Sequence, residues 1–185
     1  INWKNVSTFI NEAVKLLEEC TDSLIEWKRY FEAFEIVSYY YDEILTTDLD
    51  DDGDISYFQS VCLEILSAIA DASDIKTRRR LFNAAFRKMD TSFSFFNELY
   101  FDFIRRCFDE EEFLEKMLEC SDKLISKNNI SNYERKKWIL YHMELMDKLG
   151  YSDEAIELFC KKYRNIIEVR QFLTDRYLKS GDTDK

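Results

Sequence analysis

Residues 149–159 read Leu149-Gly150-Tyr151-Ser152-Asp153-Glu154-Ala155-Ile156-Glu157-Leu158-Phe159, the end of one helix followed by the start of another. Gly150 follows an apolar helical pattern and precedes acidic residues, as a glycine C-cap and a turn into a partner helix require. Small Ala155 permits close approach of that partner, and Phe159 lies one turn further along the same face. The stretch therefore predicts the turn and second helix of a helical hairpin.

The composition extends this prediction to the whole chain of 185 residues. There is no proline and there are three glycines, too few turn-forming residues for a β-sandwich or β-barrel of this length. A hydrophobic fraction of 46% rules out a disordered chain, although 34% of the residues are charged. Apolar residues recur at steps of three and four almost throughout, which is the spacing of amphipathic helices. The fold class we predict is all-α.

The expected helices follow one another in pairs with short polar connections. Ser56 with Gln59, and Ser131 with Glu134, have the spacing of a capping box at a helix start. Consecutive hairpins favour a right-handed α-solenoid of degenerate tetratricopeptide- or HEAT-like repeats over a closed bundle. We expect one helical-repeat domain, residues 1–185. The expected helices reach to about residue 19, then cover 23–46, 56–71, 74–89, 92–108, 110–127, 131–149, a segment from 152, and 166–179.

The hairpin at 149–159 resembles the turn and second helix of a tetratricopeptide repeat, although Gly150 and Gly181 are 31 residues apart and that repeat has 34. Residues 30–185 resemble the degenerate helical region downstream of the zinc finger in bacterial SWIM zinc-finger proteins. There, an Asp/Gly-rich loop precedes helical pairs and a KLG…EAIEL hairpin. The corresponding features here are Asp48–Asp54, the pairs within 110–149 and Leu149–Leu158. The resemblance implies a helical interaction module of a cytoplasmic bacterial protein, and no zinc ligand carries over to this chain.

The charge of the chain limits the partners that we expect. Its formal net charge is -11, which argues against direct binding of nucleic acid or of an anionic membrane. No run of 18 apolar residues occurs, so we predict no transmembrane helix. The chain begins at Ile1 without a signal-peptide pattern, and we expect it to be a fragment of a longer protein. Its five cysteines show no CxxC pair and indicate buried free thiols in the cytoplasm.

An acidic loop, residues 47–55, holds the sharpest motif, because residues 48–59 align with an EF-hand calcium loop. Gly53 stands at the sharp turn, but the last ligand position has Gln in place of the bidentate Glu. Calcium is the one candidate cofactor. The alternative is an acidic linker in which Asp54 or Ser56 caps the next helix. The candidate ligands are Asp48, Asp50, Asp52, Asp54 and Gln59.

A basic run with no acidic residue between Ile75 and Met89 could bind a phosphate or an acidic peptide. The alternative is a solvated face, or one paired with the acidic residues 109–112. The single histidine, His142, has no nucleophile or metal ligand at a recognisable spacing. We therefore predict no catalytic residue and no enzyme. The basic run comprises Lys76, Arg78, Arg79, Arg80, Arg87 and Lys88.

Tyrosine is enriched at protein interfaces, and a curved face of stacked helices suits a peptide or a partner helix. The predicted function is non-catalytic protein–protein interaction or scaffolding, and the alternative for the tyrosines is burial between repeats. A calcium-binding regulatory module is the rival function. An adaptor that helps a neighbouring zinc finger to engage nucleic acid is a third. The residues expected to bind the protein or peptide partner are Tyr39, Tyr40, Arg79, Arg80 and Tyr133.

Overall fold

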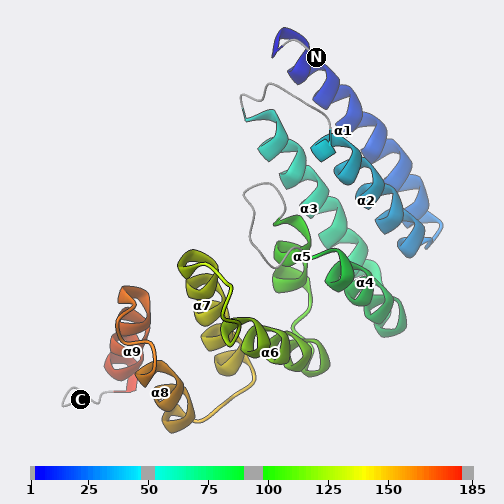
Figure 1. Ribbon diagram of the computed structural model, residues 1–185. Coiled ribbons are helices and arrows are strands. Elements are labelled where there is room, and N and C mark those ends of the chain that lie inside the picture. The colour runs from blue at the N-terminus through cyan, green and yellow to red at the C-terminus, as the bar shows by residue number, and fades with distance from the viewer. Residues whose placement is uncertain (1–2, 47–52, 90–97, 181–185) are drawn as a thin grey trace. The chain divides into compact units, whose positions relative to one another are not determined.

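The computed structural model describes residues 3–46, 53–89 and 98–180 (Figure 1). Every regular element within these ranges is an α-helix, which confirms the all-α prediction. The helices are α1 (Trp3–Glu26), α2 (Tyr30–Thr46), α3 (Asp54–Ala72), α4 (Ile75–Lys88), α5 (Leu99–Cys107), α6 (Glu111–Ile125), α7 (Asn132–Lys148), α8 (Asp153–Lys161) and α9 (Ile167–Ser180).

The chain divides into two compact units, residues 1–108 and 109–185. In unit 1, α1, α2 and α3 pack against one another, α3 also packs on α5, and α4 packs on α2 and α5 (Figure 1). Contacts therefore join α1 to α3 to α5, and α2 to α4. Unit 2 is a chain of neighbours in which α6 packs on α7, α7 on α8, and α8 on α9.

Aromatic side chains from α2, α4 and α5 fill the core of unit 1. Phe103 is fully buried, and its ring centroid lies 6.2 Å from that of Phe34 and 5.1 Å from that of Phe108. Phe82 of α4 meets Phe108 edge to face, at 5.5 Å. Such ring pairs contribute about 0.5–1.5 kcal/mol each beyond their buried area. They hold α2 and α4 side by side.

The first helix is longer than predicted. We predicted a helix to about residue 19 and another over 23–46, but α1 continues to Glu26 and α2 begins at Tyr30. Thr21 is buried within α1, where it donates its hydroxyl proton to the Leu17 carbonyl at 2.8 Å. The turn after α1 contains Lys28, whose φ of 58° lies in the left-handed region. The amide of Arg29 donates to the Leu24 carbonyl at 2.8 Å, and that of Lys28 to the Ile25 carbonyl. These bonds form a Schellman motif without glycine.

The third helix starts earlier than predicted. It begins at Asp54 after Gly53, whose φ of 103° is left-handed, and no side chain caps it. Ser56 and Gln59 therefore lie inside the helix, and the predicted capping box is wrong.

By length and composition, α3 is the one helix of the described ranges that could cross a membrane, a test that core helices also pass. Seven of its residues are buried, and it packs on three helices of unit 1.

In unit 2 the local helix signals predicted the boundaries well. Ser131 and Glu134 form the predicted capping box at the start of α7, with bonds of 3.1 and 2.8 Å. Gly150 ends that hairpin arm with a φ of 71° and a Schellman pair of backbone bonds. The Ser152 hydroxyl then accepts the Ala155 amide proton at 3.3 Å and caps α8. The predicted helix–turn–helix at 149–159 is confirmed.

Candidate functional site

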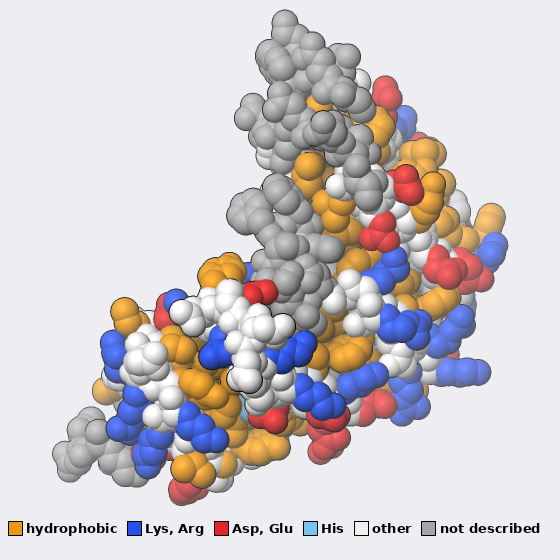
Figure 2. Space-filling view, viewed as in Figure 1, with side chains coloured by type: hydrophobic (Ala, Val, Ile, Leu, Met, Phe, Trp, Pro, Cys, Tyr) orange, Lys and Arg blue, Asp and Glu red, His pale blue; other side chains and the backbone are white. Residues whose placement is uncertain are grey.

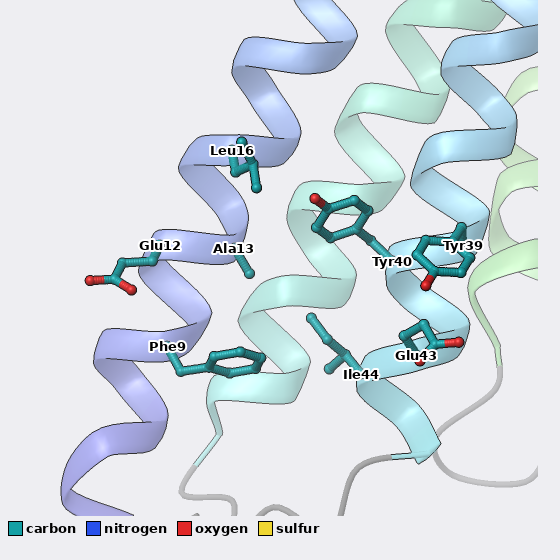
Figure 3. A pocket seen from close by; sticks show the side chains of 8 residues that line it. All are labelled: Phe9, Glu12, Ala13, Leu16, Tyr39, Tyr40, Glu43 and Ile44. Atoms are coloured by element: carbon teal, nitrogen blue, oxygen red, sulfur yellow. The ribbon is translucent and has the colours of Figure 1, made fainter.

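An apolar groove of about 500 Å³ lies between α1 and α2 in unit 1 (Figure 3). Helix α1 lines it with residues spaced i, i+3, i+4 and i+7, so they form one stripe along the helix. Helix α2 lines the other side, and α3 passes behind. The lining residues are Phe9, Glu12, Ala13 and Leu16 of α1, and Tyr39, Tyr40, Glu43 and Ile44 of α2.

The groove combines a buried floor with large exposed apolar side chains. Ala13 and Ile44 are 9% and 4% exposed and form the floor. Phe9 and Leu16 point from α1 towards α2, yet they remain 37% and 47% exposed. Tyr39 is 63% exposed. Apolar side chains of this size left open to water along a groove indicate a surface that another molecule can cover.

The rings of the two tyrosines of the groove pack against each other. Tyr39 and Tyr40 are in edge-to-face contact, with ring centroids 6.1 Å apart and planes at 83°. Tyr40 points into the groove towards α1, while Tyr39 lies on the outer side of α2 (Figure 3). The contact limits the rotation of both rings, so little side-chain entropy remains to be lost when a ligand packs on them.

Acidic side chains stand at the rims of this groove. Glu12 points outward from α1, and Glu43 lies at the α2 rim, both exposed to solvent. The chain as a whole is also strongly acidic. A ligand that places apolar groups on the floor and basic groups at the rims would match both features.

A second pocket, of about 360 Å³, lies between α2 and α4. Tyr39 lines both pockets, so it forms the wall between them. At one end Lys88 donates to the Asp42 carboxylate at 2.5 Å, and the Tyr100 hydroxyl donates to the same carboxylate at 3.2 Å. Burial raises the pKa of Tyr100, so it keeps its proton for this bond. The pocket is thus lined by aromatic residues of α2 on one side and by basic residues of α4 on the other.

The predicted partner-binding residues fall into three places. Tyr39 and Tyr40 lie together in the groove. Arg79 and Arg80 are exposed on α4, and the Arg80 guanidinium lies 4.2 Å from the centre of the Phe31 ring of α2. Tyr133 belongs to unit 2, where it is 60% exposed and Lys137 lies over its ring. The groove residues Phe9 and Leu16 were not predicted, because the spacing that marks them is also that of core residues.

The calcium candidates are only partly within the described residues. Asp48, Asp50 and Asp52 lie outside them. Asp54 is the first residue of α3, and its carboxylate accepts a hydrogen bond from the Ser7 hydroxyl of α1 at 2.7 Å. Gln59 is half-buried in the second turn of α3. Within the described ranges, no three His, Cys, Asp or Glu residues are grouped so that they could hold a metal ion.

His142 lies inside unit 2 and is 7% exposed. Its Nδ1 is 2.8 Å from the Ser121 hydroxyl, and its ring stacks on Phe159 with centroids 4.4 Å apart. Burial lowers the pKa of this imidazole, so the neutral form predominates at pH 7. The contacts are those of a histidine that packs between α6, α7 and α8.

The cysteines are free thiols in the structure. Cys62, Cys107 and Cys160 are buried, while Cys20 and Cys120 are half-buried. Burial raises the pKa of Cys62 to about 12 and that of Cys160 to about 11. Both thiols therefore stay protonated at neutral pH and behave as small apolar groups.

No family model, curated protein or solved structure matches this chain. The resemblance to the helical region of SWIM zinc-finger proteins therefore stays a prediction, and the groove between α1 and α2 is the strongest candidate site among the described residues.

Proposed function

We propose that this chain is a non-catalytic protein-interaction module that binds a helical segment of a partner protein in the groove between α1 and α2. The exposed aromatic and aliphatic lining of the groove is the observation that supports this proposal. Amphipathic helices are commonly bound in such grooves through apolar side chains at i, i+3, i+4 and i+7. Tyr39, Phe9 and Leu16 are the residues against which these side chains would pack.

The acidic residues at the rims of the groove indicate the charge of the partner. Glu12 and Glu43 are exposed on either side of the apolar floor, in a chain of net charge -11. Basic residues beside the apolar face of the partner helix would be attracted by this field, and acidic ones would be repelled. The proposed occupant is thus an apolar helical segment flanked by Lys or Arg.

We propose in addition that the hairpins follow one another as a right-handed α-solenoid. The contacts of α1 with α3, α3 with α5 and α2 with α4 in unit 1 support this, because stacked repeats contact their neighbours in this way. In unit 2, Lys136 of α7 pairs with Glu168 of α9 at 2.5 Å, so alternate helices also meet there. The groove between α1 and α2 then lies within the first hairpin of the stack.

Isothermal titration with an amphipathic peptide of Leu and Lys tests the groove. Leu16→Glu places a carboxylate among the apolar contacts, and we expect it to weaken binding at least about tenfold, which corresponds to about 1.4 kcal/mol. Leu16 is nearly half exposed, so the fold should tolerate the change.

Leu158→Glu is the matched control, because Leu158 is 64% exposed and lies in unit 2. It introduces the same charge and should leave the affinity unchanged. Equal changes of affinity in both variants would show that the peptide does not distinguish the groove from another part of the surface. That result would refute the groove as its binding site.

A further inference from the structure

We propose that the outer face of α4 is a second binding site, specific for an acidic segment of a partner protein. It differs from the groove between α1 and α2 in position and in the charge of its ligand. Tyr39 lines both sites, but the cations belong to α4 alone and Leu16 to the groove alone, so the two proposals are separable. Figure 2 shows Lys and Arg side chains gathered over α4 in an otherwise mixed surface.

The basic residues of α4 form one stripe. At 100° per residue, four cations and Asn83 fall within an arc of about 100° on the exposed side of the helix. All four cations are exposed to solvent, and no acidic residue interrupts the helix. The stripe runs over about 17 Å at a rise of 1.5 Å per residue. Its cations are Lys76, Arg79, Arg80 and Arg87.

The fold fixes the orientation of this stripe. The opposite face of α4 buries Leu81, Phe82, Ala84 and Ala85 in the core of unit 1, so the helix cannot rotate to hide its charges. The Arg80 guanidinium lies 4.2 Å from the centre of the Phe31 ring, which orients it while leaving the residue exposed. The fixed helix thus presents its cations in a row before any ligand arrives, and Arg80 among them is also oriented by Phe31.

Apolar surface lies directly beside the cations. The pocket between α2 and α4 is lined by Phe31, Tyr39 and Ala84 together with Arg87. Two acidic residues also line it: Asp42, which is paired with Lys88, and Glu35. A peptide that alternates carboxylates with apolar residues can pair with the stripe and pack on these side chains together.

Charge complementarity decides between the classes of polyanion. A nucleic acid carries a phosphate at every nucleotide and is repelled by the rest of a chain of net charge -11. A short acidic peptide presents its charge only over the length of the stripe. The acidic peptide is therefore the occupant we propose.

The test measures fluorescence anisotropy of a labelled peptide of about twelve residues, half of them Glu and the rest Leu or Ala, long enough to span the stripe as a helix. The same peptide with Gln in place of Glu reports apolar binding alone. A labelled oligonucleotide of about twelve nucleotides represents the other class of polyanion. Each is titrated with the intact chain at low and at physiological ionic strength.

The variant K76E/R87E reverses two charges of the stripe and leaves Arg80 on Phe31. We expect it to weaken binding of the Glu peptide at least about tenfold. The control K15E/K123E changes the net charge equally, at residues that are 78% and 69% exposed outside α4, and should keep the affinity within about twofold. Leu16→Glu, which disables the other groove, should also leave this affinity unchanged. Thermal melts of each variant establish that the fold is retained.

Four outcomes would overturn the proposal. The Glu peptide fails to bind the intact chain, or the Gln peptide binds as tightly. The stripe variant and the control lose equal affinity, which assigns the effect to net charge. The oligonucleotide binds through α4 more tightly than the peptide, which assigns the stripe to nucleic acid.

Discussion

Arg78 ties the ends of two helices together in unit 1. Its guanidinium donates to the Ala70 carbonyl of α3 at 3.0 Å and to the Cys107 carbonyl at the end of α5, and it lies 5.1 Å from the Phe108 ring centre. Carbonyls in the last turn of a helix lack α-helical partners, so Arg78 supplies donors where the helices end; the Ala70 carbonyl also accepts the Ser73 amide proton at 3.2 Å. The basic run in the sequence grouped Arg78 with the stripe, but its side chain serves the fold.

Replacing this residue should therefore cost stability. We expect Arg78→Ala to lower the free energy of unfolding by about 2 kcal/mol, and Arg78→Lys to recover less than half, since an ammonium group cannot span two acceptors as the guanidinium does. Exposed Arg79→Ala should change it by less than about 0.5 kcal/mol. Urea denaturation measures all three variants. Equal stability of the Ala variants at 78 and 79 would contradict the role described.

His142 makes the stability of unit 2 depend on pH. Burial, the largest cause, lowers its pKa from the ordinary 6.5, with Lys162 acting in the same direction and Asp122 against it. The unfolded chain therefore binds a proton that the folded chain resists, and this contribution to stability falls as the pH drops below about 6.5. Above that pH both states are neutral and the effect vanishes.

The variant His142→Gln removes the titrating group and keeps a polar partner for Ser121. Between pH 7 and pH 5.5 the melting temperature of the natural sequence should fall further than that of the variant. The common loss from all other groups cancels in this comparison. Parallel falls in the two proteins would contradict this account, because they would show that the pKa of His142 is the same in the folded and unfolded chains.

At the scale of elements, local signals predicted helix ends wherever the cap lies within a few residues. Ser131 with Glu134, Gly150 and Ser152 all cap as expected. Predictions failed where tertiary context decides the boundary. The hydroxyl of Thr21 bonds within its own helix because the residue is buried, and Lys28 adopts a conformation usually left to glycine.

Only part of the candidate site was predicted, because tertiary packing decides which apolar residues stay exposed. Tyr39 and Tyr40 stood out because clustered tyrosines are typical of interfaces. Phe9 and Leu16 share the helical spacing of core residues, and only the path of α2 beside α1 leaves them exposed. The sequence shows that α1 has an apolar face, but whether the residues of that face are covered depends on how α2, a later segment of the chain, packs beside it.

The position at which α3 starts determines whether the acidic loop can have the geometry of a calcium-binding loop. In a calcium loop beginning at Asp48, the seventh residue supplies a backbone carbonyl and the twelfth a side chain. Those residues are Asp54 and Gln59, and both lie in α3. The Asp54 carbonyl is therefore engaged in the helix, and Gln59 lies about 7.5 Å further along the helix axis than Asp54.

We therefore expect the acidic loop to act as a linker. Millimolar calcium should change the melting temperature by less than about 1 °C relative to chelator, whereas a site filled at about 100 times its dissociation constant would stabilise by roughly 2.7 kcal/mol. A calcium-dependent rise that disappears in Asp48→Ala and Asp50→Ala would contradict this expectation and promote the rival function.

At the scale of the whole molecule, the solenoid proposal predicts an extended particle. A compact domain of 185 residues has a radius of gyration of about 16 Å. Stacked hairpins whose contacts reach only their neighbours should exceed this value clearly in small-angle X-ray scattering. A radius near 16 Å with a symmetric distance distribution would indicate a closed helical bundle.

The central claim is that the groove between α1 and α2 holds a partner protein, and photo-crosslinking in cells tests it most directly. A photoreactive amino acid replaces Leu16 in the groove or Leu158 in unit 2, both exposed leucines. We predict one dominant adduct from position 16, absent from position 158 and lost when Tyr39→Ala is added. The same adducts from both positions, or none from position 16, would contradict the account.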